Sequence, residues 1–129
     1  MALTEDEKRV KDILSKQFHT YVKINEMRER AEKLEIKGDY EAAETIHEQA
    51  DQLQLVLDIY ERDEREGCER GLERANCAYH FISMRNARNE KITLDELGAL
   101  YLIKGERMRQ LLNKYARHVA QRFKDEVRS

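Results

Sequence analysis

Residues 93–117 have the sequence TLDELGALYLIKGERMRQLLNKYAR, which predicts two helices joined by a tight turn. Thr93 and Glu96 form a capping box, in which the hydroxyl and the carboxylate each accept a hydrogen bond from an unpaired backbone amide. Gly98 allows another helix to approach closely, and the second helix is expected to begin near Gly105. The first helix is expected to turn four side chains inward: Leu94, Leu97, Leu100 and Tyr101.

The second of these helices has one apolar and one polar face. At about 100° per residue, an apolar stripe forms on one side: Met108, Leu112, Tyr115, Val119 and Phe123, with Leu111 at its edge. The opposite side carries groups suited to DNA bases: Glu106, Arg109, Gln110, Asn113 and Arg117. Arginine can bind guanine through two hydrogen bonds, and glutamine or asparagine can bind adenine in the same way. Flanking cations are placed to contact phosphates: Lys104, Arg107 and Lys114.

From Thr93 to Val119 the sequence resembles, without a gap, the helix-turn-helix in the fourth region of bacterial primary sigma factors. That region binds the minus-thirty-five promoter element. Residues 93–98 match the Thr-Leu-Glu-Glu-Val-Gly type sequence of the family's first helix, and Tyr101 and Ile103 fit its core positions. Residues 106–111 match the start of the family's recognition helix, and two later basic positions are also matched, by Lys114 and Arg117.

The resemblance implies that four residues contact promoter DNA and that RNA polymerase is a partner: Glu106, Arg107, Arg109 and Gln110. The chain departs from the family at Lys104 and Gly105, where a threonine or serine cap and then an arginine are usual. The change removes a helix cap worth about 1 kcal/mol and one DNA-contacting side chain. Residues 67–90 match the family's preceding helix poorly, and the aromatic-rich region that melts DNA is missing. We therefore expect a small transcription regulator of a phage or mobile element rather than a complete sigma factor.

The N-terminal half predicts an antiparallel helical hairpin. A capping box formed by Thr4 and Glu7 begins one long helix, whose apolar stripe recurs every three or four residues: Val10, Leu14, Phe18, Tyr21, Ile24, Met27, Ala31 and Leu34. Gly38 and Asp39 then end this helix and cap the next. The second helix carries a heptad-like seam: Ala43, Ile46, Ala50, Leu53, Leu57 and Tyr60. This seam is the candidate interface of a homodimer, although the same residues can also pack within one chain.

The predicted fold is all-α, in three segments. Residues 1–66 form the acidic hairpin for oligomerisation or partner binding, residues 67–90 a connecting helix, and residues 91–129 the basic helix-turn-helix. Gly67 and Gly71 predict a bend between the first two segments, because glycine weakens a helix. Residues 1–84 carry 20 acidic and 13 basic side chains, whereas residues 85–129 carry 6 and 11. This asymmetry is typical of an acidic scaffold with a basic binding element.

Several functional classes are not expected. No apolar run approaches the roughly 20 residues that cross a membrane, and the first residues are unlike a signal peptide, so a cytoplasmic protein is expected. A zinc site at Cys68, Cys77 and His80 is not expected, because only Cys77 and His80 share a helical face and a fourth ligand is lacking. The sequence has no phosphate-binding loop and no nucleophile with a positioned base, so we expect neither an enzyme nor a cofactor.

Two alternatives to a DNA-binding regulator remain at this stage. The first is a helical interaction protein without DNA affinity, a sigma mimic or an adaptor that acts on RNA polymerase or another partner. The second is a packaging-type small subunit, which combines a helix-turn-helix with an oligomerising hairpin and would form rings.

Overall fold

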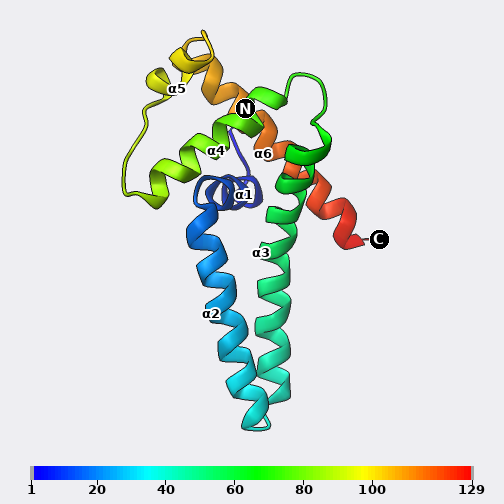
Figure 1. Ribbon diagram of the computed structural model, residues 1–129. Coiled ribbons are helices and arrows are strands. Elements are labelled where there is room, and N and C mark those ends of the chain that lie inside the picture. Colours follow the sequence, from blue (N-terminus) through cyan, green and yellow to red (C-terminus); the bar gives the residue numbers. More distant parts are fainter. Residues whose placement is uncertain (1, 129) are drawn as a thin grey trace.

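The computed structural model describes residues 2–128, and this part of the chain forms six α-helices and no strand (Figure 1). In chain order the helices are α1 Glu5–Ser15, α2 Gln17–Ile36, α3 Tyr40–Glu66, α4 Glu73–Ala87, α5 Leu94–Leu100 and α6 Gly105–Arg128. The predicted all-α fold is confirmed. The bend expected between Glu66 and Leu72 is also present, with positive φ angles at Gly67 and Gly71.

Helices α2 and α3 run side by side in opposite directions and project away from the rest of the molecule (Figure 1). Gly38 takes a φ of 87°, and Asp39 caps α3 by accepting a hydrogen bond from the amide of Ala42 at 3.3 Å. We call α2 and residues 40–57 of α3 the hairpin. Its interior is a small cluster centred on Ile24, Ala50 and Leu57.

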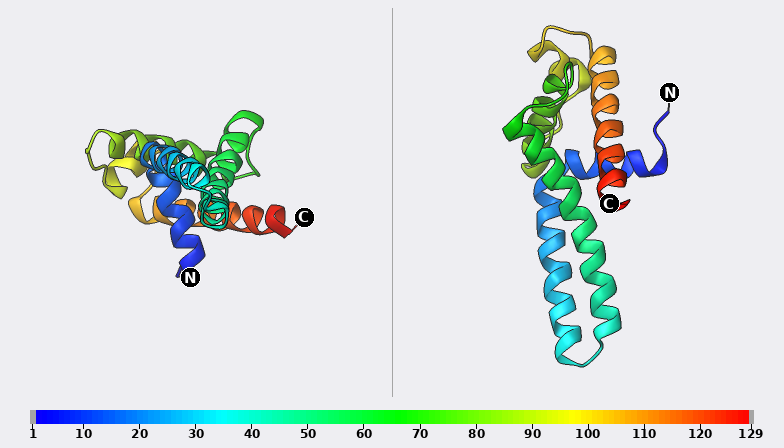
Figure 2. Two further views of the ribbon diagram at one scale, coloured as in Figure 1. Left: turned by 90° about the horizontal axis from the view of Figure 1, so that it is seen from below. Right: turned by 90° about the vertical axis from the view of Figure 1, so that its right-hand side faces the viewer.

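The expected single helix across residues 4–34 is wrong, because the chain bends at Lys16, where φ is −126° and ψ is 47°. Helix α1 therefore lies crosswise to α2 instead of extending it (Figure 2). At the bend, two backbone carbonyls that lie outside the regular helical hydrogen bonding accept hydrogen bonds from side chains instead. The Gln17 side-chain amide donates to the Leu14 carbonyl at 3.1 Å, and that of Asn86 donates to the Ser15 carbonyl at 2.7 Å. The bend leaves Phe18, predicted to be in the apolar stripe, 59% exposed.

The main core lies where α1, the C-terminal half of α3, α4, α5 and α6 meet. Its largest fully buried side chains include Tyr60, Tyr79 and Tyr115. Helix α6 packs against α1, α3, α4 and α5. The core thus takes residues from all three predicted segments, so the boundaries at 66 and 90 follow the order of helices but do not separate independent cores.

A buried hydrogen-bond network sets the position of α6 within this core. The Tyr115 hydroxyl of α6 donates to the Asp63 carboxylate of α3 at 2.9 Å and accepts from the Asn76 side chain of α4 at 2.9 Å. The Tyr60 hydroxyl donates to the Asn76 carbonyl at 3.0 Å, and the Tyr79 hydroxyl to the Leu112 carbonyl at 2.8 Å. Because buried polar groups are costly unless paired, this network favours one arrangement of the three helices.

The residues of the proposed dimer seam on α3 pack mostly within the monomer. Ala43, Ala50 and Leu57 are buried in the hairpin, and Tyr60 is buried in the main core. Ile46 and Leu53 are half-buried. The alternative that these residues pack within one chain is therefore the arrangement observed, since α2 packs along α3 and covers most of the seam.

Candidate nucleic-acid interface

Helix α5, residues 101–104 and the start of α6 form a short helix, a turn and a long helix, with α6 beginning at the predicted Gly105. The Thr93 hydroxyl caps α5 by accepting a hydrogen bond from the Glu96 amide at 3.1 Å. The predicted capping box consists of two hydrogen bonds, and this is the one present among the described residues. The turn is closed by the amides of Tyr101 and Ile103, which both donate to the Gly98 carbonyl at 3.0 Å.

The two helices approach each other closely at Gly98 and Gly105. A Cβ atom on Gly98 would lie 2.6 Å from the carbonyl oxygen of Ile103, so only glycine fits there without a shift. A Cβ atom on Gly105 would collide with the carboxylate of Asp95. That carboxylate places a negative charge at the start of α6, where the helix dipole favours it. The Asp95 carboxylate therefore offsets part of the stability lost because Lys104 and Gly105 replace the cap that is usual in the sigma factor family.

Leu102 lies in the turn between α5 and α6. It is 93% exposed and has a φ of 59°, in the left-handed region. This conformation costs a residue with a side chain roughly 1–2 kcal/mol. The turn therefore holds a large apolar side chain in solvent at a strained position.

Most of the candidate DNA-contacting side chains gather on the first three turns of α6. Six of the predicted eight are exposed: Lys104, Glu106, Arg107, Arg109, Gln110 and Lys114. The Arg109 guanidinium pairs with the Glu106 carboxylate through two hydrogen bonds, one of them 3.0 Å long. The hydrogen bond from Arg109 lowers the pKa of Glu106 from its ordinary value. Glu106 therefore stays ionised and orients Arg109.

Asn113 and Arg117 do not belong to this exposed face, contrary to the prediction. Asn113 is only 7% exposed, and its side-chain oxygen accepts a hydrogen bond from the Lys11 ammonium at 2.6 Å. Arg117 is half-buried, with its Nε 3.9 Å from the Glu7 carboxylate. The reason is the bend at Lys16, which lays α1 against this part of α6. The exposed polar face of α6 is therefore confined to its N-terminal half.

Lys11 is a candidate site residue that the sequence analysis missed. It lies 102 positions before Asn113 in the chain, so no local pattern connects the two. Burial, followed by repulsion from the nearby Arg109 charge, lowers the pKa of Lys11. Since Lys11 is still half-exposed, α1 adds a cation beside the basic face of α6.

The cysteines lie in different elements. Cys68 is in the loop before α4, whereas Cys77 is on α4, because the connecting helix predicted for residues 67–90 begins only at Glu73. Burial, with the charges of Asp63 and Glu73, raises the pKa of Cys68 to about 11, which makes its thiol a weak nucleophile. Among residues 2–128, no group of three or more His, Cys, Asp or Glu side chains is arranged to hold a metal ion.

The search for known relatives gives no support to any particular function. No protein family, curated protein or solved structure matches this chain. Within the described residues, no helix has both the length and the apolar character that crossing a membrane requires. The functional interpretation therefore depends on the geometry of α5 and α6.

Proposed function

We propose that this protein is a small DNA-binding regulator that presents the N-terminal half of α6 to the major groove. The observation that carries the proposal is the exposed polar face of α6, directly after the tight turn from α5. In helix-turn-helix proteins, the N-terminal residues of the second helix contact the base edges. The first turns of α6 are also the ones that α1 leaves uncovered.

The exposed side chains divide into two roles. Arg107 lies outside the bidentate pair between Glu106 and Arg109, whereas the Gln110 side chain also hydrogen-bonds the Glu106 carboxylate. Arg107 can reach base edges directly, and Gln110 can do so when a base replaces Glu106 as its partner. Three cations on the flanks are suited to phosphates: Lys104, Lys114 and Lys11. Arg109 joins the base contacts when DNA competes with Glu106 for its guanidinium.

A single helix of this kind buries little surface on DNA, so a second anchor is part of the proposal. A homodimer on two half-sites is one such anchor, and it needs a surface other than the buried α3 seam. RNA polymerase is the other, and it follows from the resemblance of residues 93–119 to the sigma factor element.

Fluorescence anisotropy with a labelled random-sequence duplex tests the proposal. We expect the affinity to fall roughly 100-fold between about 50 and about 200 mM salt if about four phosphates are neutralised. Lys114→Ala should weaken binding to every sequence and flatten the salt dependence, whereas Arg107→Ala with Gln110→Ala should remove preference for a sequence selected from a random pool. Absence of any salt-sensitive binding by the wild-type protein would exclude the proposed function.

A second candidate function is binding to a protein through the same turn, as a sigma mimic does. Leu94 and Leu100 are exposed on α5, contrary to the prediction that they face inward, and Leu102 is exposed in the turn. Apolar side chains of this size are typical of protein contacts rather than phosphate contacts. Pull-down with purified RNA polymerase distinguishes the two functions. A mimic should lose polymerase binding on Leu100→Ser and show no affinity for duplex DNA.

A further inference from the structure

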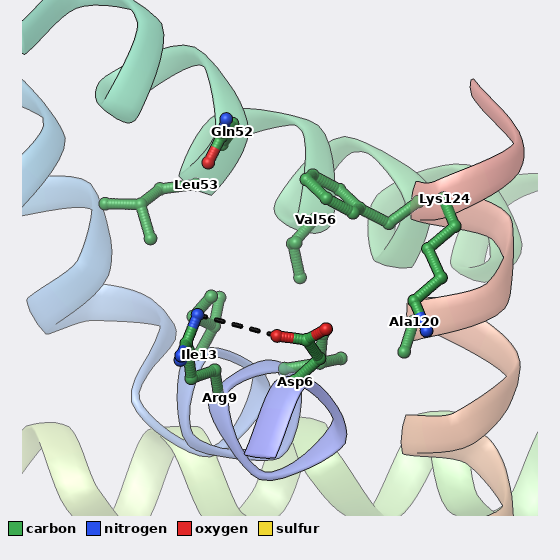
Figure 3. A pocket seen from close by; sticks show the side chains of 10 residues that line it. Asp6, Arg9, Ile13, Gln52, Leu53, Val56, Ala120 and Lys124 are labelled. Carbon is green, nitrogen blue, oxygen red and sulfur yellow. Dashed lines mark ion pairs between the residues drawn. The ribbon is translucent and has the colours of Figure 1, made fainter. Parts of the chain in front are cut away.

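A hollow lies between α1, α3 and α6, on the side of the molecule where α6 ends (Figure 3). It has a volume of about 240 Å³. Its lining is largely apolar and comes from three helices: Val10 and Ile13 of α1, Leu53 and Val56 of α3, and Ala120 and Phe123 of α6. Such a hollow has room for one or two apolar side chains.

A second, more open hollow continues from the first along the hairpin. It has a volume of about 560 Å³ and lies between α2 and α3. Gln52 and Leu53 line both hollows, and Met27 extends the apolar floor along α2. The two hollows therefore adjoin each other, and together we call them the hairpin groove. Its floor is apolar across the first hollow and consists of Met27 and Leu53 in the second.

The charges along the hairpin groove are predominantly positive. Its lining includes four cations and two anions: Arg9, Lys23, Arg30 and Lys124 against Asp6 and Glu26. Asp6 and Arg9 pair with each other at 3.5 Å (Figure 3), so the other four lining charges are three cations and one anion: Lys23, Arg30 and Lys124 against Glu26. The α3 side contributes only the uncharged Gln49 and Gln52 at its rim. A positive rim over an apolar floor is complementary to a segment with acidic and apolar faces.

We propose that the hairpin groove binds an acidic amphipathic helix of a partner protein. The partner would place its apolar face on the groove floor and its carboxylates near the rim cations, which is the helix-in-groove mode of recognition. The α2 wall from Lys23 to Arg30 spans about 10 Å, which matches about two turns of a bound helix, and the first hollow adjoins this wall.

The groove and the candidate DNA interface lie at opposite ends of α6. Arg107 and Phe123 are separated by about 24 Å along the helix axis at 1.5 Å per residue. Both surfaces can therefore be occupied together. The groove proposal stands independently of DNA binding, because none of its residues belongs to the α5–α6 turn.

The test uses a synthetic amphipathic peptide of about 15 residues, with glutamates on its polar face, leucines on its apolar face and one tryptophan among the leucines. Since this protein contains no tryptophan, the peptide's fluorescence reports binding directly. A matched peptide carries lysine at every glutamate position. We expect the glutamate peptide to bind the full chain at least roughly tenfold more tightly than the lysine peptide.

Two variants within the groove and one control outside it locate the binding surface. Arg30→Glu combined with Lys124→Glu should reverse the preference between the peptides. Arg70→Glu combined with Arg74→Glu makes the same change in net charge on exposed residues outside the groove and should leave the preference unchanged. Gln52→Phe, at an exposed position shared by both hollows, should block binding without disturbing the core. Circular dichroism confirms that each variant is folded.

Three outcomes would overturn the proposal. The first is equal binding of the two peptides, and the second is no binding of the glutamate peptide at about 1 mM. The third is that light scattering shows a dimer of the wild-type protein that Gln52→Phe dissociates, because the groove's occupant would then be a second copy of this chain. DNA affinity is measured separately, so its absence leaves the peptide result intact.

Discussion

The hairpin and the core around α6 are stabilised in different ways. The hairpin buries a narrow row of side chains and relies on small residues, with Ala31, Ala43 and Ala50 almost fully buried between α2 and α3. The core buries three tyrosines whose hydroxyls are hydrogen-bonded to neighbouring helices. The polar contacts between the hairpin helices are partly exposed, as between His47 and Glu35 at 2.9 Å, whereas the buried hydroxyl bonds of the core fix the position and rotation of a helix. The core therefore determines which face of α6 is exposed, and the hairpin extends the surface that a partner can contact.

The largest effect is expected from Tyr115→Ala in the core. The change removes a fully buried ring and leaves Asp63 and Asn76 without a shared partner, so unfolding free energy should fall by about 4 kcal/mol. Denaturant unfolding followed by circular dichroism measures this change. Tyr115→Phe is the matched control, because it removes only the hydroxyl and should cost about 1–3 kcal/mol. If the two variants were equally stable, the ring would contribute nothing beyond its hydrogen bonds.

A somewhat smaller effect is expected from Ile24→Ala in the hairpin. Loss of this buried side chain should lower the unfolding free energy by about 3 kcal/mol. Hydrogen exchange should show faster opening of amides in α2 than in α6, because the hairpin cluster is separate from the main core. Equal loss of protection in both helices would mean that the hairpin and the core unfold together.

The core tyrosines should make the protein sensitive to alkali. Burial raises the pKa of Tyr60 from its ordinary value of 10.0 to about 12, and it also raises the pKa values of Tyr79 and Tyr115. A tyrosine whose pKa is higher in the folded protein contributes its full stability below pH 10. This contribution is lost as the pH rises from 10 through the pKa of the folded state. Tyr60 alone should cost about 2 kcal/mol by pH 12.

Thermal unfolding between pH 9 and 12, with absorbance at the tyrosinate band, tests this expectation. Tyr60→Phe should reduce the dependence on pH within that window. A melting temperature that stays constant up to pH 12 would show that tyrosine burial is not linked to stability.

A gain of stability is expected from Leu102→Gly in the α5–α6 turn. Glycine adopts the left-handed conformation without the clash that a side chain causes, so the change should stabilise the fold by about 1 kcal/mol. Differential scanning calorimetry measures the shift, and Leu100→Gly, within α5, should destabilise and serves as the control. If Leu102→Gly also reduced binding to a protein partner, the strain would be explained by function.

The smallest effect is expected from Asp51→Ala on the hairpin surface. Asp51 lies 3.5 Å from Arg28, but both side chains are exposed, so the ion pair should contribute less than about 0.5 kcal/mol. Denaturant unfolding of this variant, in low and moderate salt, measures the difference. A loss comparable to that of Ile24→Ala would show that the hairpin depends on its surface charges rather than on its apolar row.

Local features of the fold were predictable where one residue acts on its own backbone. Thr4 and Thr93 cap helices as predicted, and the turn at Gly38 and the bend at Gly67 occur where glycine permits a positive φ. The break at Lys16 was not predictable in this way, because neither proline nor glycine marks it. A distant residue contributes there instead: the side chain of Asn86, 71 positions after Ser15, donates to the Ser15 carbonyl.

The candidate DNA interface was also predictable in its local features but not in its contacts between distant helices. The polarity of α6 and the start of that helix at Gly105 follow from the helical period and from the tight contact beside Gly98. Periodicity placed Asn113 and Arg117 on the exposed face because it describes one helix in isolation. The helical period takes no account of α1, which covers both residues and brings Lys11 to the candidate interface.

The sequence by itself determined the helical class, the caps and the two faces of α6, because these depend on contacts between residues a few positions apart. Only the tertiary structure decided how much of the polar face remains exposed, that α2 covers most of the α3 seam, and that two hollows adjoin in the hairpin groove. The physical reason is that burial is shared among helices distant in the chain. Which side chains remain on the surface depends on how all six helices pack together.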